Sequence, residues 1–193
     1  MQLWQDHGVA PPVLAIGICR GQFKAGAALV GDVKACLERH RLTAQSLELE
    51  FDEPALMQAA MRHAPTLRAL RDLGVRIAIT EFGSGYSSIG YLASAPVQRL
   101  KIARSLVAEA LKDAACARAV RASVQVAREL GAETVADGVE TQAQAAFLLA
   151  AGCEQAQGSF FGPALSAMEA SLLLRNTVAE PTVTSSKRGT SAA

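Results

Sequence analysis

The segment Val75-Arg76-Ile77-Ala78-Ile79-Thr80-Glu81-Phe82-Gly83-Ser84-Gly85 decides the fold: an apolar, partly β-branched run leads into a glycine-rich turn. Gly74 stands directly before it, where it would cap the end of a helix running from about Pro54 to Leu73. A helix, a strand and a polar turn in this order are typical of a parallel sheet, because parallel strands need a long, usually helical, crossover.

The same unit recurs on both sides of this segment. Apolar or β-branched runs predict six strands, at 13–18, 47–51, 75–79, 99–102, 133–136 and 152–157. Amphipathic patterns predict the helices, at about 23–40, 54–73, 105–130, 142–150 and 166–175. This strict alternation predicts an α/β protein with a parallel sheet.

Two parallel architectures fit the alternation, a doubly wound sheet and a barrel. The Gly-x-Gly-x-x-Gly fingerprint of dinucleotide-binding sheets is absent from the sequence. Polar residues gather instead at the expected C-terminal ends of the strands, where barrel enzymes build their sites: Glu50, Glu81, Lys101, Asp137 and Gln157. We therefore expect a barrel.

Composition narrows the function classes. The chain has 193 residues, enough for one domain, and a formal net charge of +1, which argues against nucleic acid as a partner. No apolar run approaches the ~20 residues that span a bilayer, and no signal peptide is evident, so a cytoplasmic, non-membrane protein is expected. Four scattered cysteines are expected to be free and buried. Residues 1–176 are predicted to form the domain, and the Ser/Thr-rich residues 177–193 a disordered tail.

Five short segments carry a family resemblance, in one order along the chain. They read Leu-Glu-Leu-Glu-Phe-Asp-Glu at 47–53, Thr-Glu-Phe-Gly-Ser-Gly-Tyr-Ser-Ser at 80–88, Leu-Lys-Ile-Ala at 100–103, Ala-Asp-Gly-Val-Glu-Thr at 136–141, and Gly-Cys at 152–153 followed by Gln-Gly-Ser-Phe at 157–160. From about Trp4 to Leu174 the chain resembles the C-terminal two-thirds to three-quarters of an EAL domain, the cyclic di-GMP phosphodiesterase domain. The resemblance implies an incomplete TIM-like (β/α) barrel whose first strands are missing.

The resemblance also implies roles for single residues. The family hydrolyses one phosphodiester bond of cyclic di-GMP with two Mg²⁺ or Mn²⁺ ions, which prefer carboxylate and amide oxygens. By position, Glu50 would bind one metal, Glu81 and Asp137 the other, Lys101 would orient the attacking water, and Gln157 would position water or substrate.

Four further positions match supporting residues of the family. Glu53 and Glu140 match carboxylates that hold the glycine-rich loop and surround the site. Gly83 and Gly85 match glycines that let this loop turn sharply near the metals.

The sequence departs from the family pattern at the ligands themselves. The Glu-Ala-Leu signature is absent, and Gly17 stands where the family has a ligand Asn. Thr80 replaces the Asp that bridges both metals, Glu81 and Asp137 exchange carboxylate lengths, and Ala103 replaces another Asp. A neutral Thr cannot bridge two divalent ions, and metal–oxygen distances tolerate only ~0.2 Å. We expect no phosphodiesterase activity, and at most one weakly bound ion.

Several readings stay open from sequence alone. Glu50 could bind a metal or pair with Lys101; Lys101 could be a counter-ion to Glu50 or Asp137; Gln157 could line a pocket or contact substrate. The hypothesis is a degenerate EAL domain that acts by binding, a protein partner or a second copy first and cyclic di-GMP weakly. An active metal-dependent phosphodiesterase giving linear pGpG, or a gene remnant without function, are the alternatives. Without the first strands, the edge at residues 13–18 is expected to be exposed and to self-associate.

Overall fold

The computed structural model describes residues 1–85 and 89–179. The chain divides into two compact units: Pro12–Ala164 forms the larger, and Met1–Pro11 together with the chain from Leu165 onward forms the smaller. The predicted disorder of the tail falls largely on residues 180–193, which lie outside the described residues.

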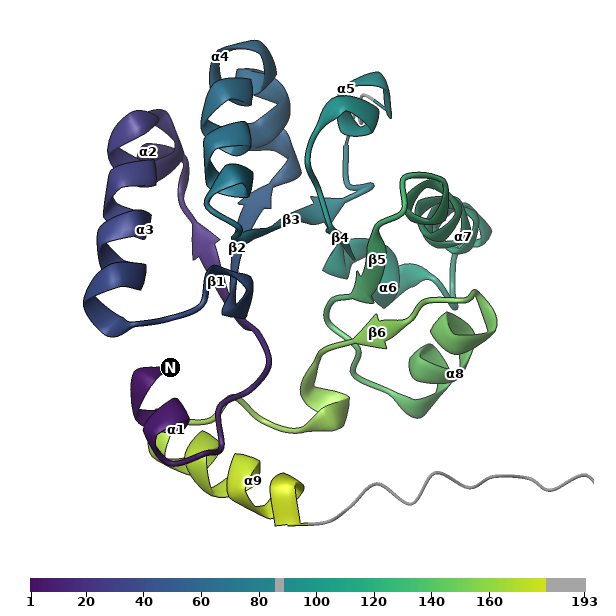
Figure 1. Cartoon of the computed structure of the whole chain (residues 1–193). Coiled ribbons are helices and arrows are strands. Elements are labelled where there is room, and N and C mark those ends of the chain that lie inside the picture. The colour runs from purple at the N-terminus through teal and green to yellow at the C-terminus, as the bar shows by residue number, and fades with distance from the viewer. Residues whose placement is uncertain (86–88, 180–193) are drawn as a thin grey trace, which may run out of the picture. The chain divides into compact units, whose positions relative to one another are not determined.

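A six-stranded parallel sheet forms the centre of the larger unit (Figure 1). Its strands are β1 (Leu14–Ile18), β2 (Leu47–Asp52), β3 (Arg76–Phe82), β4 (Arg99–Ile102), β5 (Glu133–Ala136) and β6 (Gln155–Ala156). Each strand pairs with the next one in sequence, so β1 and β6 are the two edges. A doubly wound sheet reverses its strand order at a switch point. The uninterrupted order is that of a barrel, as the sequence predicted.

Helices cover one face of this sheet, around the outside of its curve (Figure 1). Their bounds are α2 (Arg20–Lys24), α3 (Ala27–His40), α4 (Glu53–Asp72), α5 (Ile89–Ser94), α6 (Arg104–Glu109), α7 (Ala114–Glu129) and α8 (Gln142–Ala150), with short 3₁₀ turns at Ala44–Ser46 and Ser159–Phe161. None of the described helices is long and apolar enough to cross a membrane.

Two predicted helices are each broken in two. The helix expected at 23–40 is interrupted at Gly26, whose φ of +56° is a left-handed conformation that a helix interior does not allow. The helix expected at 105–130 stops at Glu109 and restarts at Ala114, where the carboxylate of Asp113 accepts a hydrogen bond from the Ala115 N–H (2.7 Å) and caps the new helix.

Strand lengths also differ from the prediction. β3 continues to Phe82, so Thr80 and Glu81 lie within the strand, at a register irregularity between Ile79 and Phe82. The sixth strand was predicted over 152–157, but only Gln155–Ala156 pairs with β5.

Alternation along the strands separates an apolar face from a polar face. The apolar side chains of β2 and β3 (Leu49, Phe51, Ile77 and Ile79) are at most 2% exposed and join a core cluster with leucines of α3 and α4. Ile102 and Ala136 of β4 and β5 join a second cluster under α6, α7 and α8. The four cysteines are free as expected, but only Cys153 is buried.

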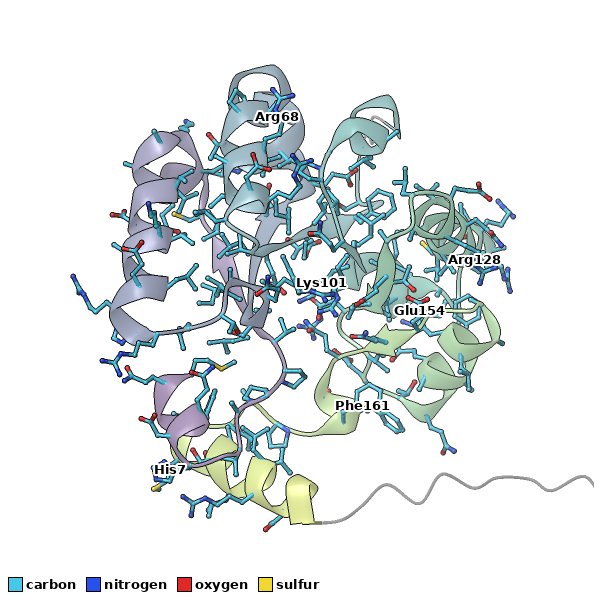
Figure 2. All side chains as sticks on the ribbon, viewed as in Figure 1. His7, Arg68, Lys101, Arg128, Glu154 and Phe161 are labelled. Atoms are coloured by element: carbon cyan, nitrogen blue, oxygen red, sulfur yellow. The ribbon has the colours of Figure 1, made fainter. Side chains whose placement is uncertain are left out.

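The opposite, inner face of the sheet is charged. Glu48 and Glu50 of β2 alternate with the core residues, and Arg99 and Lys101 do the same on β4. Lys101 points to the inner side of the sheet (Figure 2). Because each strand places its alternate residues on this face, the face carries Glu50 and Lys101, two of the site residues that the sequence singled out.

In its described part, the smaller unit contains the helices α1 (Gln2–Asp6) and α9 (Ala167–Ala179). They are joined by a hydrogen bond from the Trp4 indole N–H to Ser171 Oγ (2.6 Å). Helix α9 extends beyond the predicted end at Arg175 into residues that the sequence assigned to the tail.

Candidate functional site

Glu50 and Lys101 form an ion pair on the inner face of the sheet. Lys101 Nζ lies 2.8 Å from Glu50 Oε1, and the side chains are 8% and 17% exposed. The pair reaches across β3, where Ala78 is the register partner of Glu50 and its small side chain leaves room for the lysine. Of the two counter-ions considered for Lys101, the structure selects Glu50.

Asp137 and Gln157 lie together directly after β5 and β6. Gln157 Nε2 donates a hydrogen bond to Asp137 Oδ1 (2.9 Å). Asp137 is half-buried and Gln157 is exposed. We call Glu50–Lys101 and Asp137–Gln157 the mouth pairs, since both lie toward the C-terminal ends of the strands.

Thr80 and Glu81 occupy the irregular end of β3. Thr80 is half-buried and is the register partner of Asp52 on β2. Glu81 is exposed and has a φ of +56°, and its carbonyl accepts hydrogen bonds from the backbone N–H and hydroxyl of Ser84 (3.2 and 2.7 Å). A left-handed glutamate costs of order 1 kcal/mol and is held by this turn.

Gly17 stands on β1 as the register partner of Glu50. A Cβ at Gly17 would meet no atom within 4 Å. The position is open, so the absence of a ligand there follows from the residue type and is not imposed by packing.

Glu53 holds the start of the glycine-rich loop. It is 2% exposed, and its Oε2 accepts a hydrogen bond from the Gly83 N–H (3.0 Å), while Oε1 has no partner among the described residues. Gly83 has a φ of +85°, a backbone conformation that favours glycine, and a Cβ there would lie 3.0 Å from Leu106 Cδ1, so a larger residue would also have to displace this side chain slightly. Gly85 has open space around it.

Two further ion pairs lie at the same end of the strands and were not foreseen from the sequence. Arg104 pairs with Glu140, and Arg20 pairs with Asp52 (3.4 Å). All four side chains are more than a third exposed, so each pair contributes less than ~1 kcal/mol. Glu140 therefore lies at the surface beside the mouth pairs.

A closed ring of four charges lies at the opposite end of the inner face. Glu48 accepts from Arg76 Nε (3.3 Å) and Arg99 Nη1 (2.9 Å), and Glu133 accepts from Arg76 Nη2 (3.0 Å) and from Arg99. The side chain of Glu48 is 1% exposed. We call these four residues the charge ring.

The charge ring shifts the pKa of two of its members. Hydrogen bonds from Arg99 and Arg76 outweigh burial and hold the pKa of Glu133 below its usual value. Burial works against the charge of Arg76, but the hydrogen bonds and charges of Glu133 and Glu48 outweigh it and raise the pKa of Arg76. The sequence held a signal for this ring, because Glu48 and Arg99 precede Glu50 and Lys101 by two positions, on the same face of their strands.

The chain matches the EAL domain family over residues 1–164. The chain belongs to the EAL domain family. Among sequence relatives, it is 41% identical over 162 residues to the bifunctional diguanylate cyclase/cyclic di-GMP phosphodiesterase MucR of Pseudomonas aeruginosa, a match that covers 84% of this chain and 24% of MucR. It is 38% identical over 148 residues to the cyclic di-GMP phosphodiesterase NbdA of the same organism, covering 77% of this chain and 19% of NbdA.

Solved EAL structures share the fold. A cyclic di-GMP complex of the MucR phosphodiesterase superposes with a TM-score of 0.84 at 39% identity, covering 88% of this chain and 68% of that one. The EAL domain of Mycobacterium smegmatis DcpA gives a TM-score of 0.85 at 35% identity, covering 91% of this chain and 78% of that one. The parallel sheet therefore belongs to a TIM-like barrel, and the chain spans about a quarter or less of the length of these sequence relatives.

The donor set at the mouth does not fit a carboxylate-bridged pair of divalent ions. Gly17 brings no side chain to its position opposite Glu50, and Thr80 brings only a neutral hydroxyl. Within the described ranges, no three or more His, Cys, Asp or Glu side chains gather closely enough to hold an ion. Glu50, Glu81 and Asp137 keep the hard oxygens that Mg²⁺ or Mn²⁺ prefers.

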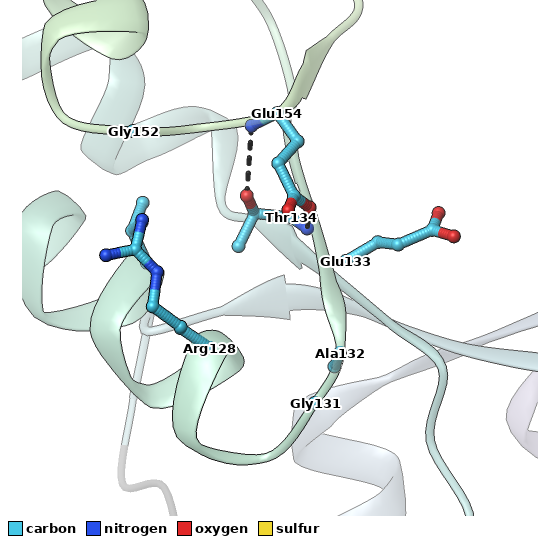
Figure 3. A pocket seen from close by; sticks show the side chains of 8 residues that line it. Arg128, Gly131, Ala132, Glu133, Thr134, Gly152 and Glu154 are labelled. Atoms are coloured by element: carbon cyan, nitrogen blue, oxygen red, sulfur yellow. Dashed lines mark hydrogen bonds between the residues drawn. The ribbon is translucent and has the colours of Figure 1, made fainter.

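A separate pocket of about 260 Å³ opens at the other end of β5 (Figure 3). Arg128 extends into it from the end of α7, and Thr134 Oγ1 accepts a hydrogen bond from the Glu154 N–H (3.2 Å). Barrel chemistry is built at the C-terminal ends of strands, so this pocket is not part of the candidate site.

Proposed function

We propose that this chain is a degenerate EAL domain that acts in cyclic di-GMP signalling by binding and does not hydrolyse the nucleotide. The proposal rests on the residues found at the positions where the family has its metal ligands. Thr80 supplies no carboxylate next to Asp52, Gly17 supplies no amide oxygen next to Glu50, and the Glu50 carboxylate is bound to the Lys101 ammonium. A hydrolase that depends on two bridged metals needs those ligands to generate its nucleophile.

A chromatographic assay of cyclic di-GMP cleavage tests the loss of activity. The purified chain, with Mg²⁺ and separately with Mn²⁺, is expected to give no linear product, while the MucR phosphodiesterase assayed beside it does. The double variant Thr80→Asp with Gly17→Asn is expected to remain inactive, because the sequence has no Glu-Ala-Leu ligand. Turnover that requires Mn²⁺ and disappears in Glu50→Ala would establish the active-enzyme alternative.

Binding is expected to favour a protein over the nucleotide. The polar groups left at the mouth are few, and each net hydrogen bond contributes only about 1 kcal/mol. Titration calorimetry is therefore expected to give weak cyclic di-GMP binding, at best micromolar, and a sub-micromolar dissociation constant would contradict the proposal.

A further inference from the structure

One face of helix α7 carries a row of exposed hydrogen-bond donors. Its members stand three, four and three positions apart: Arg118, Arg121, Gln125 and Arg128. At this spacing they lie on one side of the helix, and a rise of 1.5 Å per residue makes the row roughly 15 Å long. Another face of α7 packs against β4 and β5. We call these four residues the donor row.

Two arginines of the donor row reach toward helix α8. The guanidinium carbon of Arg121 lies 5.1 Å from the centre of the Phe147 ring on α8. Arg128 extends into the pocket at the end of α7, and its Nη2 lies 3.2 Å from the place that a Cβ on Gly152 would take (Figure 3). A guanidinium held over an aromatic ring keeps the N–H groups at its edge available for hydrogen bonds. The donor row therefore follows the seam between α7 and α8 and ends in a hollow of about 260 Å³.

The arginines of the donor row have no carboxylate partner among the described residues. Three acidic side chains lie near the end of the row, but each is directed elsewhere. Glu133 is bound in the charge ring and points away from Arg128 (Figure 3). Glu154 Oε2 accepts a hydrogen bond from the Thr134 N–H (3.0 Å). Glu129 is exposed and lies about 100° around the helix from Arg128. The donor row therefore keeps its positive charge uncompensated.

We propose that the donor row binds an acidic helix of a partner protein, laid along the seam between α7 and α8. The spacing of three, four and three reads the same in both directions, so a helix with carboxylates at that spacing matches it whichever way the helix runs. Guanidinium groups bind carboxylates through two parallel hydrogen bonds, which suits the arginines of the row. This inference names the chemistry of the protein partner proposed above and rests on that proposal.

An acidic protein segment fits this surface better than a membrane or a nucleic acid does. The valines of α7 are packed against the two core clusters, so the helix has no apolar face to insert into lipid. The chain as a whole has a formal net charge of +1, which gives no broad positive field for a phosphate backbone. A short row of arginines beside a hollow matches a partner of similar size, such as one helix.

Nuclear magnetic resonance of the arginine side chains tests the proposal on the full chain. The probe is an alanine-rich helical peptide, about 15 residues long, whose glutamates stand three, four and three positions apart. The Nε–Hε signals of Arg121 and Arg128 are expected to move and to saturate as the peptide is added. A peptide with glutamine at the same positions is expected to leave these signals unchanged, because it offers no carboxylate.

Two triple variants with the same loss of charge separate the donor row from general attraction. The first is Arg118→Gln, Arg121→Gln and Arg128→Gln, and the second is Lys24→Gln, Arg39→Gln and Arg68→Gln, at exposed positions on α2, α3 and α4. Since an exposed ion pair is worth up to about fivefold in affinity, the first variant is expected to bind the acidic peptide at least about tenfold more weakly. The second is expected to bind within about twofold of the parent chain.

Circular dichroism of each variant shows that it is folded, so that weaker binding reports on the surface. Signals that stay unchanged up to about 1 mM peptide, equal losses in the two triple variants, or equal binding of the glutamine peptide would each overturn the proposal. A response to phosphatidylserine vesicles or to duplex DNA without a response to the peptide would assign the row to that partner and overturn it as well. Cleavage of cyclic di-GMP would contradict only the proposed loss of hydrolysis, so the two failures are distinguishable.

Discussion

The charge ring and the mouth pairs share one face of the sheet, but their charges are balanced in different ways. In the charge ring, each carboxylate forms ion pairs with both arginines, and the side chain of Glu48 is fully buried. In the mouth pairs, each carboxylate has a single side-chain partner among the described residues, Lys101 for Glu50 and Gln157 for Asp137. Gln157 and Glu81 are exposed. In a closed network around a buried carboxylate, removing one member leaves its partners without a counter-charge. The more open mouth carries the neutral Thr80 without such a cost.

Removing a carboxylate from the charge ring is expected to have the largest effect. Glu48→Gln leaves the Arg76 and Arg99 guanidiniums without their buried counter-charge, and it is expected to lower the free energy of unfolding by about 3–5 kcal/mol. Urea denaturation measures the change. A loss below about 1 kcal/mol would show that the ring is hydrated, and the contrast with the mouth would disappear.

Glu53 is expected to rank second. Glu53→Ala leaves the Gly83 N–H without its acceptor and is expected to cost about 2 kcal/mol, with faster hydrogen exchange at the Gly83 amide. Glu53→Gln keeps an acceptor oxygen of the same reach, so it serves as the matched variant and is expected to cost clearly less. Equal losses in the two variants would mean that the charge of Glu53, and not its hydrogen bond, holds the loop.

The Glu50–Lys101 pair is expected to give a smaller value than the ring. A double-mutant cycle of Glu50→Gln and Lys101→Met isolates their interaction, which is expected to be about 1–2 kcal/mol because Glu50 retains access to water. A coupling energy as large as the stability lost in Glu48→Gln would show that this pair stabilises the protein as strongly as the charge ring does.

Lowering the pH is expected to reduce the stability that the Glu133 carboxylate contributes to the charge ring, and this is the smallest of the expected effects. The folded pKa lies below the unfolded value of about 4.3, so the stabilisation is present above that pH and is lost as the pH falls through the folded pKa. The urea midpoints of the parent and of Glu133→Gln are therefore expected to become more similar as the pH is lowered from about 6 to about 3. A difference that stays constant would show that Glu133 contributes nothing through its charge.

The strand–helix alternation was predictable because it depends on the pattern of apolar and polar residues within each short segment. Apolar runs located all six strands. Glu50 and Lys101 stood out as polar residues at the expected C-terminal ends of strands, and their pairing was one of the readings considered. The helix breaks at Gly26 and before Asp113 were missed, since amphipathic periodicity continues through both. They depend on a left-handed glycine and a capping carboxylate, which override the periodic pattern.

Local patterns place Glu48 and Arg99 on the inner face, but they do not show which charges of the ring bind one another. The hydrogen bonds of the charge ring join residues 28, 34, 51 and 57 positions apart. Only the strand order and register bring these residues into one layer, and the register depends on packing across the whole sheet. The left-handed Glu81 is a similar case, because its conformation comes with the irregular pairing at the end of β3.

The strand order also sets how the chain can fold during synthesis. Register partners in neighbouring strands lie as few as 20 positions apart (Val135 to Gln155), and none of the sheet's pairings joins its first strand to its last. Each new strand can therefore dock as soon as it leaves the ribosome, and the closure entropy of each step stays small. A nascent chain released after β4 would already contain Glu48, Arg76 and Arg99, and would lack only Glu133 to complete their network.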